Sequence, residues 1–254
     1  MIALAGKTVV ITGGGAGLGR EIALQLSQAG ARVAVLGRTL ASLEETARQA
    51  GGDVLPLVAD VGDPAQVAAA FLEVEQRFGG LDILVNNAAV YRAFALAEAS
   101  DDELQQTLTT NVLGPLYCMR AVLPLMRSRG GDIVNVSSES VLDPFPMLSC
   151  YAGSKSALEV ISSGLRSELA ADDIRIMVFR TGRMDGDNAN LAAWPEGRLQ
   201  QFMAAATASG HMARVGAGMS PQSSAQAITL MLSLPRDACV HQLDLCSTLQ
   251  EVRS

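Results

Sequence analysis

The sequence predicts an α/β fold, a doubly wound parallel sheet of about seven strands with helices on both faces. Short, nearly continuous apolar runs recur along the chain, and segments with helical periodicity separate them. Apolar runs of this kind are typical of strands that are buried on both faces. Because no linker rich in Pro, Gly or Ser divides the chain, we expect a single domain over residues 1–254.

The expected strands are residues 7–12, 32–36, 54–58, 81–86, 132–137, 174–180 and 240–245. The expected helices are residues 18–29, 40–50, 64–78, 101–127, 152–171 and 221–233. Asp63 and Ser220 each precede a proline, which is typical of a helix start, and Ser100 with Glu103 forms a capping box. The stretch 185–219 lacks the alternation, so we expect a lid over a site there.

Composition excludes several classes of protein. A chain that is 49% hydrophobic and 18% charged is too apolar to be disordered, and its net charge of −7 argues against nucleic-acid binding. It has no apolar run of about 18 residues, so no membrane span is expected, and residues 1–10 lack the pattern of an export signal. The four cysteines form no CxxC pair and the two histidines lie far apart, which predicts reduced thiols, a cytoplasmic location and no metal site.

The first expected strand ends in a glycine-rich turn, Thr-Gly-Gly-Gly-Ala-Gly-Leu-Gly, that runs into a helix at residues 12–19. Glycines allow the backbone to approach a phosphate closely, and a helix N-terminus offers unpaired N–H groups. This placement after a strand and before a helix favours a dinucleotide over a loop of no special function. The predicted cofactor contacts here are Gly13, Gly15, Ala16, Gly17, Leu18 and Gly19.

The second strand indicates which dinucleotide binds. An acidic residue near its end normally holds the ribose hydroxyls of NAD, but Gly37 and Arg38 stand there. Because a guanidinium pairs with phosphate, Arg38 favours NADP(H) over NAD(H), although NAD(H) stays possible. The alternative is that Arg38 is an ordinary solvated charge.

These motifs resemble the short-chain dehydrogenase/reductase family in its single-domain, Rossmann-type form. Further signatures follow in the family's order: Asp60-Val61 resembles its adenine-contacting pair, and 86–89, Asn-Asn-Ala-Ala, resembles its Asn-Asn-Ala-Gly motif. The resemblance implies cofactor contacts at Asp60, Val61, Asn87, Ala88 and Ala89. Asn111, followed by Gly114, matches the family's helix asparagine, which implies that it holds a water in a proton relay.

A catalytic set follows at family spacing. Tyr151 and Lys155 lie four apart, on one face of a helix, and Ser138 precedes Tyr151 by thirteen residues, at the end of a strand. Tyrosine, with a pKa of about 10, is a poor acid at neutral pH unless a nearby ammonium favours its phenolate. Lysine occurs only at Lys7 and Lys155 among 19 basic residues. By resemblance, Ser138 orients a carbonyl, Tyr151 donates the proton, and Lys155 assists Tyr151 and binds the cofactor ribose.

The sequence departs from the family after the sixth strand. The family carries Pro-Gly and then a threonine near the nicotinamide carboxamide, whereas this chain has Thr181-Gly182 and Gly186 in those places. Met184 still offers backbone groups to the carboxamide. The substrate pocket is expected between 139–148, 91–94 and the lid, which suggests a mainly apolar ketone or aldehyde. Its candidate residues, each of which is alternatively lid core, are Phe145, Met147, Leu148, Met184, Trp194, Phe202 and Met212.

We therefore expect an NADP-dependent oxidoreductase that interconverts a carbonyl and an alcohol by hydride transfer. The alternative is a dinucleotide-sensing or interaction protein of the same fold without turnover, which the departures at Thr181 and Gly186 motivate. The expected partners are a small-molecule substrate and further copies of the chain. By analogy with the family, the helices at 101–127 and 152–171 would pair between subunits in a homotetramer or homodimer. Arg183 and Arg198 are read as solvated charges rather than as substrate contacts.

Overall fold

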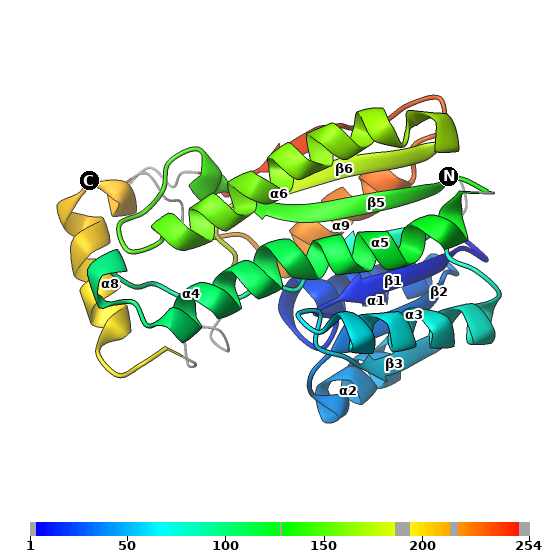
Figure 1. Ribbon diagram of the computed structural model, residues 1–254, viewed down its shortest axis with the longest axis horizontal. Coiled ribbons are helices and arrows are strands. Elements are labelled where there is room, and N and C mark those ends of the chain that lie inside the picture. Colours follow the sequence, from blue (N-terminus) through cyan, green and yellow to red (C-terminus); the bar gives the residue numbers. More distant parts are fainter. Residues whose placement is uncertain (1–3, 128, 186–193, 214–217, 249–254) are drawn as a thin grey trace.

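The computed structural model describes residues 4–127, 129–185, 194–213 and 218–248. Over these residues seven strands form one parallel sheet in the order β3-β2-β1-β4-β5-β6-β7, with every pair of neighbours parallel, as Figure 1 shows in part. The strands are β1 Thr8–Thr12, β2 Arg32–Gly37, β3 Val54–Val58, β4 Ile83–Asn86, β5 Gly131–Ser138, β6 Ile174–Thr181 and β7 Gln242–Leu245. The predicted fold class is therefore confirmed.

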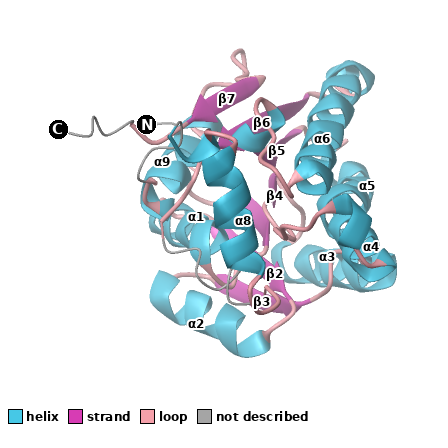
Figure 2. Ribbon diagram, turned by 90° about the vertical axis from the view of Figure 1, so that its left-hand side faces the viewer, coloured by secondary structure: helices cyan, strands magenta, loops and turns pink. Residues whose placement is uncertain are grey.

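Helices cover both faces of the sheet, because successive strand residues point to opposite sides. Val9 and Ile11 of β1 pack into the core beside α1 and α9, whereas Val10 packs into the core beside α3, α5 and α6. Figure 2 shows these two layers of helices on either side of the strands. The helices are α1 Gly17–Gln28, α2 Leu40–Ala50, α3 Pro64–Phe78, α4 Asp101–Leu108, α5 Gly114–Met126, α6 Ser149–Glu168, α8 Arg198–Ala208 and α9 Pro221–Leu232.

The expected helix starts are confirmed by their capping bonds. Asp63 accepts hydrogen bonds from the first turn of α3, and Ser220 accepts one from Ser223 in α9. At α4, Ser100 and Glu103 form both halves of the capping box. These side chains satisfy N–H groups that the helix itself leaves unpaired.

The expected single helix over 101–127 is wrong in its middle. A π-helical turn, Thr109–Leu113, separates α4 from α5, and the N–H of Gly114 donates to the carbonyl of Thr109, five residues back. Pro115 supplies the reason, since it has no N–H to donate to the carbonyl of Asn111 in a regular α-helix. The irregular turn therefore lies at a residue that the sequence assigned to the site.

The segment expected as a lid contains ordered structure in its described part. Helix α8 and a short 3₁₀ turn, His211–Ala213, lie beyond the carboxyl ends of the strands, where Figures 1 and 2 both place α8. Residues 186–193 and 214–217 of the expected lid, including Gly186, lie outside the described residues. The lid therefore remains a prediction for the segment as a whole, and its described helix lies at the end of the sheet where ligands bind in such folds.

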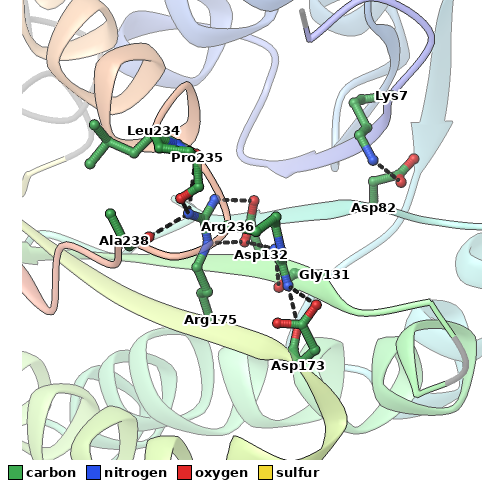
Figure 3. A network of polar contacts seen from close by, with 10 residues as sticks. All are labelled: Lys7, Asp82, Gly131, Asp132, Asp173, Arg175, Leu234, Pro235, Arg236 and Ala238. Carbon is green, nitrogen blue, oxygen red and sulfur yellow. Dashed lines mark hydrogen bonds and ion pairs between the residues drawn. The ribbon is translucent and has the colours of Figure 1, made fainter. Parts of the chain in front are cut away.

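A buried ion cluster fastens the opposite end of the sheet (Figure 3). Asp132 of β5 accepts two hydrogen bonds from Arg175 of β6, at 2.7 and 2.8 Å, and one from Arg236, at 2.6 Å. The side chains of Asp132 and Arg175 are only 10% and 7% exposed. The hydrogen bonds that Arg175 donates to Asp132 raise the pKa of Arg175, so this guanidinium stays charged although it is buried.

We expect Asp132→Ala to lower the free energy of unfolding by roughly 3 kcal/mol, because it leaves a buried guanidinium without its counter-ion. Lys7→Ala is the matched control. Lys7 pairs with Asp82 at 2.8 Å but its side chain is 51% exposed, so its loss should cost at most about 1 kcal/mol. Urea unfolding measures both values. Equal losses in the two variants would contradict the argument from burial.

Candidate active site

The glycine turn between β1 and α1 is shaped by close contacts. A Cβ on Gly19 would collide with the carbonyl oxygen of Gly13, and one on Gly14 would lie 2.7 Å from Cβ of Val35. Gly13 itself has a φ of +67°, a conformation that glycine adopts without strain. Only glycine therefore allows strand and helix to meet this closely.

The outer side of the same turn is open. A Cβ on Gly17 would meet no atom within 4 Å, and both Ala16 and Gly17 are exposed. Helix α1 starts without a side-chain cap and has no acidic residue in its first turn. The first turn of α1 therefore carries no negative charge of its own. Its N–H groups suit an anion such as the pyrophosphate of a dinucleotide.

Two residues that the sequence analysis did not single out support this turn. The hydroxyl of Thr12 accepts hydrogen bonds from the N–H groups of Asn87 and Ala88, each at 3.0 Å. The guanidinium of Arg20 donates to the carbonyl of Gly15 and to Thr46 of α2. In the sequence, the only sign that Thr12 and Arg20 support the turn is their position next to the glycines.

The side chain of Asn87 also belongs to this support. Its amide donates to the carbonyls of Thr12, at 2.9 Å, and Gly13, at 3.3 Å. The predicted motif after β4 is therefore packed directly against the predicted phosphate turn.

A polar cavity of about 440 Å³ lies next to the end of β2. Its lining includes Arg38, Asp60, Thr109 and Thr110, so the exposed guanidinium that follows β2 faces the same space as the loop after β3. Val61 does not line this cavity, since its side chain is buried in the core. Of the predicted adenine-contacting pair, only Asp60 has its place on the cavity wall.

Tyr151 and Lys155 lie one turn apart on α6, and both are buried. The ammonium nitrogen of Lys155 is 5.9 Å from the centroid of the Tyr151 ring and donates to the carbonyl of Val136 at 2.8 Å. Burial lowers the pKa of Lys155 to about 8. The predicted pair is therefore close in space, and the pKa of its lysine lies closer to neutral pH than that of a lysine in water.

Ser138 is the last residue of β5, next to Thr181 of β6 in the sheet register. Its hydroxyl oxygen accepts hydrogen bonds from the N–H and the hydroxyl of Ser140, at 3.2 and 3.0 Å. Because both bonds use lone pairs of the oxygen, the hydroxyl hydrogen of Ser138 is left to donate elsewhere. This is the role that the resemblance implied, donation to a carbonyl oxygen.

Asn111 lies fully buried in the π-helical turn. Its amide oxygen accepts from the N–H of Val90 at 2.7 Å, and its amide nitrogen donates to the carbonyl of Val90 and to the hydroxyl of Ser154, at 2.9 and 3.0 Å. Ser154 in turn donates to the carbonyl of Tyr151 at 2.6 Å. The side chain of Asn111 thus joins the loop after β4 to the helix that carries Tyr151.

A cluster of aromatic side chains, the aromatic wall, lies beside Tyr151. The ring of Tyr91 meets that of Tyr151 edge-on with centroids 4.9 Å apart, and Trp194 lies 5.5 Å from both Tyr91 and Phe202. Phe145, Met147 and Leu148 belong to the same apolar cluster. Of the predicted pocket residues, Met184 instead packs against the core beside α1 and α9, and the half-buried Met212 is not in the aromatic cluster.

The reading of Arg198 as a solvated charge is wrong. Its side chain is 15% exposed, and its guanidinium donates to the carbonyl of Ala93 at 2.8 Å and to Glu103 at 3.3 Å. These bonds hold α8 against the loop that carries Tyr91. Arg183, in contrast, is exposed, as its reading as a solvated charge requires.

Met147 has a backbone that favours glycine, with a φ of +67°. Its carbonyl accepts a hydrogen bond from the N–H of Phe94 at 2.8 Å, which ties the loop before α6 to the loop after β4. A strained non-glycine residue beside a buried tyrosine is typical of a functional site. The sequence alone gave no signal of this conformation.

The segment after β6 carries the predicted carboxamide contact. Met184 forms a parallel bridge with Met219, in which Met219 donates to the carbonyl of Arg183 at 3.0 Å and accepts from the N–H of Asp185 at 2.9 Å. In a bridge of this form the N–H and C=O of Met184 itself point away from Met219. They therefore point to the side opposite Met219, where a contact to a ligand would form.

Two features are missing from the residues that the structure describes. No helix among them combines the length and the apolar character that a membrane span needs. His, Cys, Asp and Glu side chains in the same part of the chain do not gather in threes that could hold a metal ion. Of the cysteines, Cys118 is buried and Cys150, next to Tyr151, is half-buried, so burial raises the pKa of each thiol.

Comparison with known proteins agrees with this geometry. The chain is 34% identical over 212 residues to dehydrogenase/reductase SDR family member 7B of Bos taurus, an overlap of 80% of this chain and 65% of the bovine protein. It is 32% identical to an uncharacterised oxidoreductase of Staphylococcus aureus strain MW2, over 73% of this chain and 81% of that protein. An alcohol dehydrogenase of Thermococcus sibiricus, complexed with 5-hydroxy-NADP, superposes with a TM-score of 0.81 at 25% identity, covering 98% and 99% of the two chains.

A match to a whole family accompanies these single similarities. Residues 7–195, which run from the first strand to just past Trp194, fit the sequence profile of the short chain dehydrogenases. This range includes the glycine turn, the Asn87 support and the Ser138, Tyr151 and Lys155 set. The chain therefore belongs to the short-chain dehydrogenase family.

Proposed function

We propose that the protein interconverts a carbonyl and an alcohol by hydride transfer, and that it mainly reduces a ketone or aldehyde with NADPH. The observation that carries the proposal is the buried pair on α6. The Lys155 ammonium lies 5.9 Å from the centroid of the Tyr151 ring, inside an apolar wall. A phenol beside an ammonium gives up its proton more readily than a phenol in water, which is the chemistry that carbonyl reduction needs.

The residues divide the work as follows. The nicotinamide dinucleotide, when bound, supplies the hydride. The open glycine turn would hold its pyrophosphate, and Lys155 would bind its ribose. Ser138 donates its hydroxyl hydrogen to the substrate oxygen, and Tyr151 passes its proton to that oxygen as negative charge develops there.

Asn111 has a twofold part in the proposal. Its side chain holds the loop after β4 and, through Ser154, the first turn of α6, so it fixes the place of Tyr151. Its main-chain carbonyl lies in the π-helical turn, opposite Pro115, which has no N–H to offer. A water on this carbonyl would return a proton to the relay after each turnover.

The preference for NADP(H) rests on Arg38. This exposed guanidinium follows Gly37 at the end of β2 and lines the polar cavity with Asp60. A guanidinium pairs with a phosphate on the adenine ribose, and the chain has no carboxylate at position 37 to hold bare ribose hydroxyls. The Thermococcus alcohol dehydrogenase, with its bound 5-hydroxy-NADP, supports the same preference.

We expect Arg38→Ala to weaken NADPH binding by roughly tenfold or more and to leave NADH binding within about twofold, because only NADPH carries the extra phosphate. Fluorescence titration of both dinucleotides measures the two dissociation constants. Arg77→Ala is the control, since it removes another exposed guanidinium, in the last turn of α3. If the native protein bound NADH as tightly as NADPH, and Arg38→Ala changed neither, the preference for NADP(H) would be refuted.

The proposed substrate is a mainly apolar ketone or aldehyde, since the ring of Tyr91 packs edge-on against Tyr151, and Trp194 and Phe202 belong to the same apolar cluster. Consumption of NADPH and NADH across a panel of aromatic, cyclic and short aliphatic carbonyls tests the reaction. NADPH binding without consumption on any carbonyl would instead support a dinucleotide sensor.

We also propose a homodimer or homotetramer. An apolar groove of about 300 Å³ between α5 and α6, lined by Leu116, Met119, Leu123 and Leu165, supports pairing of these helices between subunits. Sedimentation measures the assembly.

A further inference from the structure

Glu139 follows Ser138 at the carboxyl end of β5, and its side chain reaches the chain segments that follow β6 and β7. One carboxylate oxygen accepts a hydrogen bond from the N–H of Arg183, just beyond β6, at 3.0 Å. Cys246, just beyond β7, lies beside the same carboxylate, and both are close to Gly182. A single half-buried carboxylate thus joins the ends of three strands, one of which carries Ser138.

The backbone around this carboxylate is packed closely. A Cβ on Gly182 would lie 2.7 Å from the second carboxylate oxygen of Glu139 and 3.1 Å from Cα of Cys246. The N–H of Gly182 donates to the carbonyl of Leu245 at 2.8 Å. A side chain at position 182 would therefore displace the Glu139 carboxylate, so the glycine lets this carboxylate pack against the chain after Thr181.

This contact restrains the peptide before Met184 from one side. The N–H of Arg183 is held by Glu139, and the carbonyl of Arg183 is held by Met219 at 3.0 Å. Because the carbonyl of Arg183 points to Met219, the N–H of Met184 in the same peptide points the other way, and the bond from Asp185 to Met219 turns the C=O of Met184 likewise. Glu139 holds the peptide before these two. Thr181 stands where the family has a proline, whose ring would fix the backbone angle φ. The backbone after β6 is therefore less rigid by itself than one that contains this proline.

We propose that Glu139 is a positioning residue, which holds the backbone at Gly182–Met184 so that Met184 presents its N–H and C=O to the carboxamide of a bound nicotinamide. This rests on the proposed function, because it needs a nicotinamide dinucleotide in the site. Glu139 acts through Arg183 and touches neither the hydride nor the substrate oxygen. Its carboxylate replaces the rigidity that the family obtains from proline.

The two halves of the dinucleotide make the role testable by binding alone. NADPH carries the nicotinamide, whereas 2′,5′-ADP carries only the adenine half, which would lie near Arg38. Glu139→Ala should weaken NADPH binding by roughly tenfold, because a hydrogen bond to a charged acceptor is lost, and should leave 2′,5′-ADP binding within about twofold. Titration calorimetry of the full-length protein measures both.

Glu139→Gln is the conservative variant. Its amide oxygen still accepts from the N–H of Arg183, so NADPH binding should return to within about threefold of the native value. With a carbonyl substrate, Glu139→Ala should raise the KM for NADPH more than it lowers kcat. A residue with only a general structural role would weaken both ligands and would not be rescued by glutamine.

The reactivity of Cys246 tests whether the Glu139 carboxylate lies beside it, and this test needs no ligand. Burial and the nearby Glu139 carboxylate raise the pKa of its thiol. Both Glu139→Ala and Glu139→Gln remove the negative charge, so iodoacetamide at pH 8 should alkylate Cys246 several-fold faster than in the native protein. Peptide mass mapping separates Cys246 from the exposed Cys239, whose rate should not change and which serves as the internal control.

The outcomes separate this inference from the proposed function. Native protein that fails to bind NADPH would contradict the proposed function itself, and the inference with it. Native protein that binds and consumes NADPH, with Glu139→Ala equal to it in NADPH affinity, would overturn only the role of Glu139. Equal loss of NADPH and 2′,5′-ADP binding, or an unchanged alkylation rate of Cys246 in both variants, would also overturn it.

Discussion

Tyr151→Phe is expected to lower kcat for NADPH-dependent carbonyl reduction by roughly a thousandfold, because it removes the proton donor and leaves the rest of the site in place. The phenylalanine ring keeps the edge-on contact with Tyr91, whose centroid lies 4.9 Å away, so the apolar wall should persist. NADPH affinity should change by less than about threefold, since the lost hydroxyl holds at most one hydrogen bond. Steady-state kinetics and fluorescence titration measure the two effects.

Tyr117→Phe is the matched control for this loss. Tyr117 lies on α5, where its ring contacts the Arg120 guanidinium at 5.3 Å, far in sequence from the catalytic set. The Tyr117→Phe substitution removes a phenol hydroxyl but leaves the proposed proton donor in place, so activity should stay near the native level. If Tyr151→Phe kept most of the NADPH-consuming activity across the carbonyl panel, the proposed mechanism would be wrong.

Lys155→Arg should keep the positive charge and still lose most of the turnover, by roughly a hundredfold or more. Lys155 is 2% exposed, and its ammonium fits between the Val136 carbonyl and the Tyr151 ring. A guanidinium is longer and planar, so it cannot take the same place without moving the helix or the strand. Lys7→Arg is the control, because Lys7 is exposed and distant from the site. Equal kcat values for native protein and Lys155→Arg would contradict the requirement for a compact ammonium.

Burial of Lys155 also predicts how pH acts on the protein. Its pKa falls from the ordinary 10.5 to about 8, because burial disfavours the charged form. The ammonium is therefore present below about pH 8, and carbonyl reduction should decline as the pH rises through that value. A rate that kept rising above pH 9 would show that the ammonium is not needed.

The same shift acts on stability with the opposite sign. Below about pH 8 the folded protein must bury a charge that the unfolded chain leaves in water, so stability is reduced there and recovers between pH 8 and 10.5. Without dinucleotide, Lys155→Met should therefore raise the free energy of unfolding at pH 7 by up to roughly 3 kcal/mol while abolishing turnover. Urea unfolding at pH 7 checks this. An inactive variant that is more stable than the native protein cannot owe its inactivity to unfolding.

Much of the fold could be predicted because the signals are local. Apolar runs such as the one that became β5, and capping residues such as Asp63 and Ser100, act on neighbours within a few positions. Boundaries shifted by up to three residues at α6, which begins at Ser149 rather than at residue 152. The break at Thr109–Leu113 was missed because helical periodicity continues through it, although Pro115 stood in the sequence as its cause.

The sequence by itself determined the sheet, the glycine turn and the residue types of the catalytic set, because these depend on periodicity and on fixed spacings along one strand or helix. Only the tertiary structure decided which side chains meet across separate strands. It turned Arg198 from a solvated charge into a link between α8 and the loop at Ala93, and it showed that the side chain of Val61 packs in the core. It also brought Glu139 to Arg183, 44 positions along the chain. Such contacts depend on strand order and packing, and the residues next to each position in the sequence indicate neither.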